Sequence, residues 1–341
     1  MDIRNRKGLR QEAAAALADN PGDPRKTLLV FITVTMAATL LSSLLVTVLN
    51  SRIANTGGLG GMGLRSILTT IRQVVPMAVS LALMALELGY WGTALEMSLR
   101  RSVQPRTLLM GFPRFGALIR MMFAQGLVYL LLFIAALNVG SIIFMATPLA
   151  RDFYTLVVPL VQDVEALYDA MYHDPAFAGQ LIRTMIPVFP IIGVLFLAAA
   201  APVFYRYRLT RFCLLDNRYL GALAAMSQSA QMSKGHRMDL VKLDLSFWWF
   251  YLGQFLGTAL AYGDVILDLC GLSLPWSATV NSYVFYGAYM IFQGLLYFLF
   301  LNRVQTTYAL AYESLRPQPR PTQGGVVLGN IFDLAREYKD Q

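Results

Sequence analysis

One carboxylate stands near the middle of a long apolar stretch, and it is the first residue to consider for chemistry. Glu87 lies in the sequence LMALELGYWG, with mostly apolar residues on both sides. A carboxylate inside a membrane is costly, so it typically marks a site for a proton, an ion or a substrate. The alternative is a structural role, in which a protonated Glu87 hydrogen-bonds to glutamines of neighbouring membrane segments. The candidate glutamines are Gln125, Gln254 and Gln293.

Three further acidic residues lie near the ends of apolar stretches. Glu96 is expected to pair with Arg100, one helical turn later, which is a structural role. Asp264 and Asp268 are one turn apart at the outer end of an apolar segment, where they could hold a cation with help from an acidic loop. The other interpretation of this pair is a solvated helix end.

The inventory of residues does not favour an enzyme. The two histidines, His173 and His236, are expected on opposite sides of a membrane, so one chain cannot form a two-histidine metal site. The sequence contains no HExxH, GxSxG or Walker motif. The glycine-rich stretch GLGGMGLRS at 58–66 has no Lys after it, and we expect an outer hairpin there. We therefore predict no catalytic residue, no metal and no cofactor.

The composition is that of a membrane protein. Of the 341 residues, 56% are hydrophobic and 14% are charged, whereas a soluble globular protein has about 25% charged residues. The net charge of +8 does not indicate nucleic-acid binding, because a soluble basic domain would not carry such long uncharged runs. Cys213 and Cys270 are expected on opposite sides of the membrane, which excludes a disulfide between them.

Six segments are long and apolar enough to cross about 30 Å of hydrocarbon, which takes roughly 20 helical residues. Each must be helical, because lipid offers the backbone no hydrogen-bond partner. We expect an all-α membrane protein, a six-transmembrane-helix bundle with amphipathic cytoplasmic interfacial helices. A cytoplasmic amphipathic segment at 1–26 would precede the membrane domain at 27–302, and a cytoplasmic tail at 303–341 would follow it. The expected spans are Thr27–Leu49, Val74–Met97, Ala117–Ala146, Met185–Phe204, Leu245–Leu267 and Tyr283–Leu301.

Basic residues set the orientation of these spans. Of the 28 Lys and Arg residues, 23 fall in the N-terminal segment, the second loop, the fourth loop at 205–244 and the C-terminal tail. By the positive-inside rule both termini are therefore cytoplasmic. The third loop, at 149–184, is expected to be an acidic outer loop that is partly helical. Its acidic residues are Asp152, Asp163, Glu165, Asp169 and Asp174.

The stretch AQMSKGHRMDLVKLDLSFWWFY, at 230–251, passes abruptly from charged to aromatic residues. Tryptophan and tyrosine settle at the membrane boundary while Lys and Arg face anionic headgroups, so the chain re-enters the membrane here. Before it, a helix that begins at Asp216 or Asn217 is expected to end at Gly235 and to bury one face. That face comprises Tyr219, Leu223, Met226 and Ala230, and the interfacial anchors are Tyr205, Arg206, Tyr207, Arg208, Lys234, Arg237, Lys242, Trp248 and Trp249.

The same region resembles a known family. The run YRYRLTRFCLLDN, the helix end Met-Ser-Lys-Gly and the re-entry Leu-Asp-Leu-Ser-Phe are similar to features shared by a bacterial membrane family, domain of unknown function 975. The segments LRQEAAAALADN and TTYALAYESL also fit, so the resemblance covers Arg6 to about Leu315. It implies six spans in the bacterial cytoplasmic membrane and no particular activity. The chain departs from the family pattern in its acidic third loop and in Trp248 and Trp249.

Two classes of function are compatible with these features. In the first, the protein is a non-enzymatic membrane accessory, a scaffold or partner-binding subunit that associates with another membrane protein or with itself. The GxxxG motif at Gly253 to Gly257 favours close contact between helices, either between two copies of the chain or within the bundle. In the second, it is a small-solute or lipid transporter with Glu87 as its working residue. We expect no broken span and few polar groups at the midplane, which favours the first class. The second class predicts a cavity that reaches Glu87.

Overall fold

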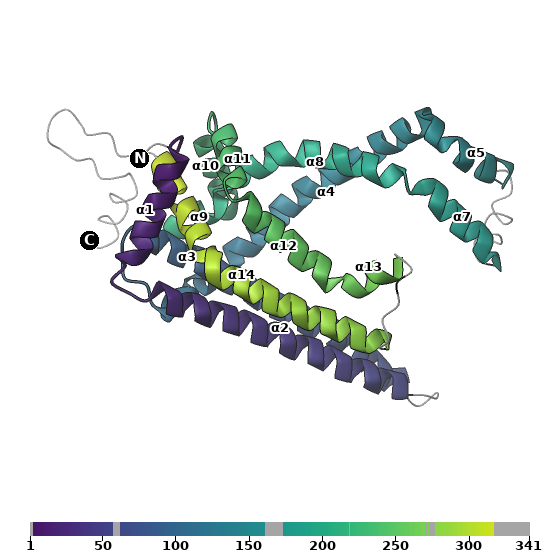
Figure 1. Ribbon diagram of the computed structural model, residues 1–341, viewed down its shortest axis with the longest axis horizontal. Helices are drawn as coiled ribbons and strands as arrows, with labels where there is room; N and C mark the ends of the chain where they lie inside the picture. Colours follow the sequence, from purple (N-terminus) through teal and green to yellow (C-terminus); the bar gives the residue numbers. More distant parts are fainter. Residues whose placement is uncertain are drawn as a thin grey trace.

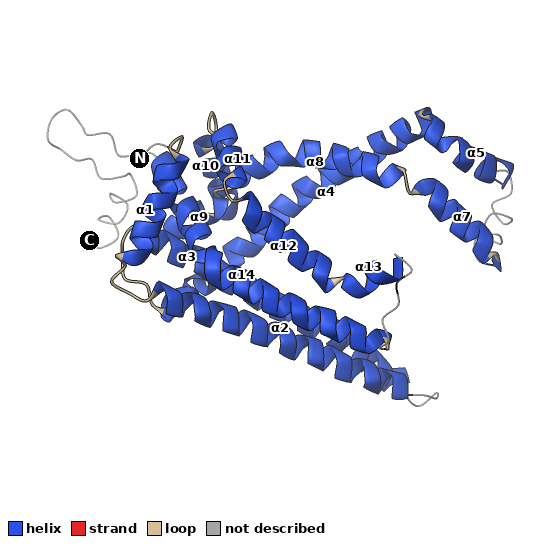
Figure 2. Cartoon of the chain, viewed as in Figure 1, coloured by secondary structure: helices blue, strands red, loops and turns tan. Residues whose placement is uncertain are grey.

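The computed structural model describes residues 3–56, 62–160, 173–217, 219–269, 272 and 277–316. Within these ranges the chain is built from helices and contains no strand (Figure 2). The predicted all-α membrane fold is confirmed. Cys270 lies outside the described residues, as do the first part of the glycine-rich hairpin, at 58–61, and the third-loop acids Asp163, Glu165 and Asp169.

Long apolar helices account for most of the described chain. Along them, side chains such as Leu41 (67% exposed), Ile142 (70%) and Val194 (67%) are in contact with no other part of the chain over most of their surface. Apolar exposure on this scale is not compatible with water, so these side chains face lipid and the protein is a multi-pass membrane protein. Five stretches among the described residues are long and apolar enough to span: Pro24–Asn55, Gly63–Ser98, Pro105–Ala146, Gly179–Asp216 and Val280–Leu315.

The beginnings of the helices are specified by local sequence. The helix α2 begins after Asp23, whose side chain accepts a hydrogen bond from the Lys26 N–H at 2.9 Å, and Pro24 occupies its first position. Ser277 accepts from the Val280 N–H in the same way at the start of α14. The long helices are α2 (Pro24–Asn55), α3 (Met62–Ser98), α4 (Phe115–Ala146), α8 (Val188–Tyr207) and α14 (Ala278–Leu315).

The buried core lies at one end of the molecule, where the described parts of the N-terminal segment, the second loop, the fourth loop and the end of α14 come together (Figure 1). Leu9, Phe212 and Tyr308 are almost completely buried there. The amphipathic helix expected near the N-terminus packs against α14 in this core. Around the ends of the long helices, the core is completed by α1 (Arg6–Ala18), the 3-10 helix η2 (Pro105–Arg114), α9 (Thr210–Asp216), α10 (Ala222–Met232) and α11 (Arg237–Leu245).

The expected span Leu245–Leu267 is not a single helix, and six unbroken spans are not confirmed. Within it, α12 (Trp248–Ala261) ends and α13 (Gly263–Leu269) begins. Gly263, the first residue of α13, lies so close to the ring of Phe285 that a β-carbon would not fit there unless the ring moved. The 14 residues of α12 cover only about 21 Å, less than the hydrocarbon thickness of about 30 Å.

Other segments are helical beyond their expected limits. The helix α3 begins at Met62, so 62–66 are helical and the second span starts well before Val74. The helix α14 continues to Leu315, so 303–315, expected in the tail, is helical and Tyr308 and Tyr312 are buried. The described part of the third loop is largely helical, as expected, in η3 (Pro148–Ala150), α5 (Arg151–Val157), η4 (Val158–Leu160) and α7 (Pro175–Met185).

The buried face of α10 differs from the expected one. Its bounds differ as well, because α10 extends from Ala222 to Met232 instead of from Asp216 or Asn217 to Gly235, although the chain does turn at Gly235, which has a φ of +86°. Met226 is buried, but Leu223 is 70% exposed. The helix is oriented instead by Ser229, whose hydroxyl donates to the Arg206 carbonyl at 3.1 Å. Its buried residues are Ala222, Ala225, Met226, Ser229 and Met232.

Candidate functional site

Glu87 forms an ion pair with Arg211 of α9. The guanidinium of Arg211 also lies over the ring of Trp91, 4.9 Å from the ring centroid. The side chain of Glu87 remains 45% exposed and that of Arg211 30% exposed, so both can be reached. In place of the expected glutamines, Arg211 is the partner that the structure gives Glu87, because α9 packs against α3 and brings a cation to the carboxylate.

A second cluster forms around Arg208, one helical turn before Arg211. Its Nη2 atom lies 3.2 Å from Asp244 Oδ1 and donates to the Tyr251 hydroxyl at 3.0 Å. The Tyr308 hydroxyl also donates to Asp244, and the Arg208 guanidinium lies 4.4 Å from the centroid of the Tyr308 ring. Asp244 therefore joins the end of α8 to α11, α12 and α14.

A cavity of about 410 Å³ lies against both clusters. Glu87, Arg208 and Arg211 contribute its charged groups. Two of the predicted polar residues, Gln125 and Gln254, line it together with Gln305, whereas Gln293 lines a second cavity of about 480 Å³ between α2, α12 and α14. The structure thus brings three of the four predicted intramembrane polar residues to one site. Most of the remaining wall is aromatic: Phe31, Tyr90, Trp91, Tyr129, Phe204, Tyr207, Phe250, Tyr251, Tyr297 and Tyr308.

Two residues that line the cavity each carry a buried polar atom with no hydrogen-bond partner within the described residues, Arg208 Nε and Gln305 Oε1. An unpaired buried donor or acceptor costs roughly 1–3 kcal/mol. The charges of the two ion pairs, Glu87 with Arg211 and Asp244 with Arg208, cancel. The site can therefore bind a molecule that offers both a hydrogen-bond acceptor and a donor and that carries no net charge.

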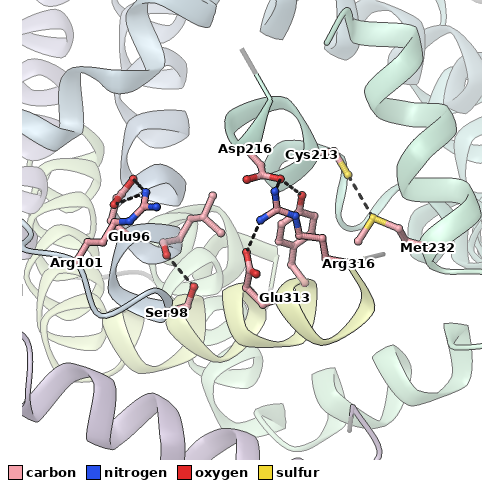
Figure 3. A network of polar contacts seen from close by, with 10 residues as sticks. Glu96, Ser98, Arg101, Cys213, Asp216, Met232, Glu313 and Arg316 are labelled. Carbon is pink, nitrogen blue, oxygen red and sulfur yellow. Dashed lines mark hydrogen bonds and ion pairs between the residues drawn. The ribbon is translucent and has the colours of Figure 1, made fainter. Parts of the chain in front are cut away.

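The expected pairing of Glu96 with Arg100 is wrong. Glu96 pairs with Arg101, 3.4 Å away (Figure 3). The helix α3 ends at Ser98, and Arg100 then adopts a positive φ of 55°, which turns its side chain towards Asp19 at 3.9 Å. Glu96 keeps the structural role that the sequence indicated, with a different partner.

The same end of the molecule holds a network around Asp216 (Figure 3). Arg316 pairs with Asp216 at 3.0 Å, and the Tyr312 hydroxyl donates to the same carboxylate at 2.9 Å. Asp216 is therefore not the cap of the following helix. It is the last residue of α9 and joins α9 to the end of α14.

The predicted interfacial anchors separate into exposed and packed residues. Trp248 is 61% exposed, whereas Trp249 packs edge-on against Phe300 with 4.2 Å between the ring centroids. Tyr207 and Arg208 line the cavity instead of facing headgroups. Tyr205 is half-buried, and the exposed group comprises Arg206, Lys234, Arg237, Lys242 and Trp248.

Only one residue of the predicted outer acidic pair has a described side chain, so its binding of a cation stays a prediction. Asp264 accepts hydrogen bonds from the Ser282 hydroxyl and from the Val265 N–H, so it connects α13 to α14. Asp268 lies in α13, and its side chain is not among those described. No group of three His, Cys, Asp or Glu residues within the described ranges could hold a metal ion.

Comparison with known proteins identifies a family and no individual relative. No curated protein and no solved structure matched the chain. One family model matched it over residues 1–318, which agrees with the resemblance seen in the YRYRLTRFCLLDN region. The chain belongs to the family described as "Protein of unknown function (DUF975)".

Proposed function

We propose that the protein binds a small polar solute in the cavity at Glu87 and moves it across the membrane, without catalysing a reaction. The cavity itself is the observation that carries this proposal, because three charged side chains and three glutamines line one space. Its volume of about 410 Å³ is within the range of roughly 300–1,000 Å³ typical of small-molecule sites. Ionisable side chains that line a cavity within a membrane protein usually mark a substrate or ion path.

The accessory role, which the sequence favoured, rested on unbroken spans and on few polar groups in the membrane domain. The break between α12 and α13 removes the first argument, and the polar wall of the cavity removes the second. A scaffold would have no need for unpaired buried atoms such as Arg208 Nε and Gln305 Oε1. The GxxxG motif at Gly253 to Gly257 is explained by helix contact within the bundle, because Gly253 packs closely on Leu296 and Gly257 on Gln293.

The proposed location is the bacterial cytoplasmic membrane, with both termini in the cytoplasm. The described parts of the N-terminal segment, the second loop, the fourth loop and the end of α14 lie at one end of the molecule, which supports it, since these segments carry most of the basic residues. Among their helices, α1, α9, α10 and α11 can be followed in Figure 1. The cavity at Glu87 would then lie towards the cytoplasmic end of the membrane domain.

A liposome swelling assay tests the proposal. Proteoliposomes are placed in isosmotic solutions of a sugar, a zwitterionic amino acid or the sodium salt of a carboxylic acid, and light scattering reports solute entry. We expect swelling with one of the two net-neutral solutes. Glu87→Gln should slow it by about tenfold, as expected for the loss of a charge-assisted contact of about 1.4 kcal/mol.

Asp19→Asn is the matched control, because it removes a carboxylate from an ion pair that is distant from the cavity and largely exposed. It should leave swelling unchanged. Swelling no faster than in protein-free liposomes for all three solutes would contradict the proposal, as would equal rates for Glu87→Gln and the unsubstituted protein. If the protein causes no swelling and a partner protein co-purifies with it, the accessory role would be the better supported function.

A further inference from the structure

The second cavity continues the first along the same helices. On α14, Tyr297, Gln305 and Tyr308 line the first cavity, whereas Tyr286, Gln293 and again Tyr297 line the second. On α12, Gln254 belongs to the first and Thr258 to the second. From Tyr286 to Tyr308, α14 rises about 33 Å, which is close to the hydrocarbon thickness of about 30 Å.

The second cavity has polar groups in a mostly apolar wall and no charged side chain. Among the described residues that line it, Thr35, Thr39, Thr258 and Gln293 are polar, and tyrosine is the one ionisable type. Thr35 Oγ1 and Gln293 Oε1 are buried without a hydrogen-bond partner in the described part of the chain. Four of the six such atoms found there thus belong to residues that line the two cavities, where a polar solute would satisfy them after a side-chain rotation.

Two aromatic residues, Phe31 and Tyr297, are shared by both cavities and separate them. Phe31 is only 6% exposed and stacks on Tyr90 with 4.6 Å between the ring centroids. The Tyr90 hydroxyl donates to Asn302 at 2.6 Å, and the Asn302 amide donates to the Pro24 carbonyl at 3.1 Å. This series of contacts holds the Phe31 ring in place between the cavities.

We infer that the two cavities are the inner and outer chambers of one solute path, and that Phe31 and Tyr297 form the gate between them. The inference rests on the proposed function and adds the route and the class of solute. Because the walls of the outer chamber carry no charged side chain, an ion would be desolvated there without a counter-charge. The solute is therefore net-neutral, either a zwitterion or an uncharged polar molecule.

Cysteine accessibility tests the gate without any solute. In a Cys213→Ala, Cys270→Ala background, Thr35→Cys reports on the outer chamber and Gln305→Cys on the inner one. The probe is an uncharged methanethiosulfonate that carries a sugar group and does not cross lipid, applied from either side of vesicles of known orientation. Gln305→Cys should react from the cytoplasmic side only and Thr35→Cys from the outer side only.

Removing either ring should open the path. We expect Phe31→Ala, and separately Tyr297→Ala, to raise the reaction rate of Thr35→Cys from the cytoplasmic side by at least about tenfold, because each leaves a cavity in place of a ring. Leu29→Ala is the matched control, since Leu29 is 52% exposed on the same helix and lines neither cavity. Retained labelling of Gln305→Cys shows that a variant is folded.

The inference is overturned if Thr35→Cys reacts from the cytoplasmic side as fast as Gln305→Cys while both rings are present. It is also overturned if neither ring removal changes the rate, or if Thr35→Cys does not react from the outer side. Because labelling needs no solute, these outcomes are independent of the swelling assay. A working gate in a protein that causes no swelling would refute the proposed function instead.

Discussion

A single guanidinium holds the connection between α9 and α10. Arg114, at the end of η2, donates from Nη2 to the carbonyls of Leu214 at 2.9 Å, Asn217 at 2.9 Å and Leu220 at 2.8 Å. Carbonyls at the end of a helix have no donor within the helix and need one from elsewhere. Arginine presents its donors in a fixed planar arrangement, here Nη2 together with Nε, which also donates to the Leu214 carbonyl, whereas the three donors of lysine share one nitrogen on a flexible chain and do not reproduce this geometry.

Arg114→Lys should therefore destabilise the protein despite keeping the charge. We expect a loss of about 1.5–3 kcal/mol, the usual contribution of a hydrogen bond to a charged group, seen as a lower Tm in detergent. Arg120→Lys is the control, because the Arg120 Nε donates only to the Gly116 carbonyl, within α4. Equal Tm values for the two variants would show that the contacts of Arg114 do not stabilise the fold.

The residues of the site illustrate what sequence could and could not predict at this scale. Glu87 could be selected because it is a carboxylate within an apolar run. Its partner Arg211 could not, because the two are 124 residues apart and meet only when α9 packs on α3. Arg208 was assigned to headgroups for the same reason, although its spacing of three from Arg211 places both on one helical face.

At the scale of elements, α3 and η2 pack backbone against backbone. Among the described glycines, the shortest distances from a β-carbon position to a neighbouring atom are found between these two elements. A β-carbon on Gly89 would overlap the carbonyl of Leu108, and one on Gly111 would overlap that of Ala85. Both obstructing groups are backbone, so neither can move without shifting an element. Glycine at these positions allows η2 to lie directly on α3 beside the cavity.

Gly89→Ala should consequently destabilise the protein by about 1–3 kcal/mol or more, as overpacking does. Gly126→Ala is the matched control in α4, because nothing lies within 4 Å of its β-carbon position. It should be neutral or stabilising by up to about 1 kcal/mol, since alanine favours a helix over glycine. Thermal unfolding of both variants in detergent measures the difference, and a Gly89→Ala protein as stable as Gly126→Ala would contradict this packing.

The elements that sequence predicted well are those that local signals specify. Asp23 and Pro24 mark the start of α2, and Gly235 ends the turn after α10. The break between α12 and α13 was not predicted, because the segment is largely apolar and contains no proline at this point. Apolar composition predicts that a segment is buried in lipid or protein, and it does not predict where the helix is interrupted.

At the scale of the whole molecule, the basic segments and the buried core occupy the same end. The orientation that follows can be tested with single cysteines at exposed positions, Asn55→Cys at the end of α2 and Ser102→Cys after α3. In intact cells an impermeant maleimide should label Asn55→Cys, and it should label Ser102→Cys only after permeabilisation. The reverse pattern would mean that the termini lie outside and that the positive-inside rule fails for this chain.

The most direct test of the account is whether the cavity at Glu87 binds a net-neutral polar solute. The measurement is the Tm of the purified protein in detergent against the concentration of a sugar, a zwitterionic amino acid and a carboxylate salt. A ligand that binds the folded state stabilises it by about 2.7 kcal/mol at one hundred times its Kd. We predict a saturable rise in Tm with the sugar or the amino acid that is lost in Glu87→Gln and Arg211→Gln and kept in Asp19→Asn. No rise with any of the three solutes, or the same rise in all variants, would contradict the account.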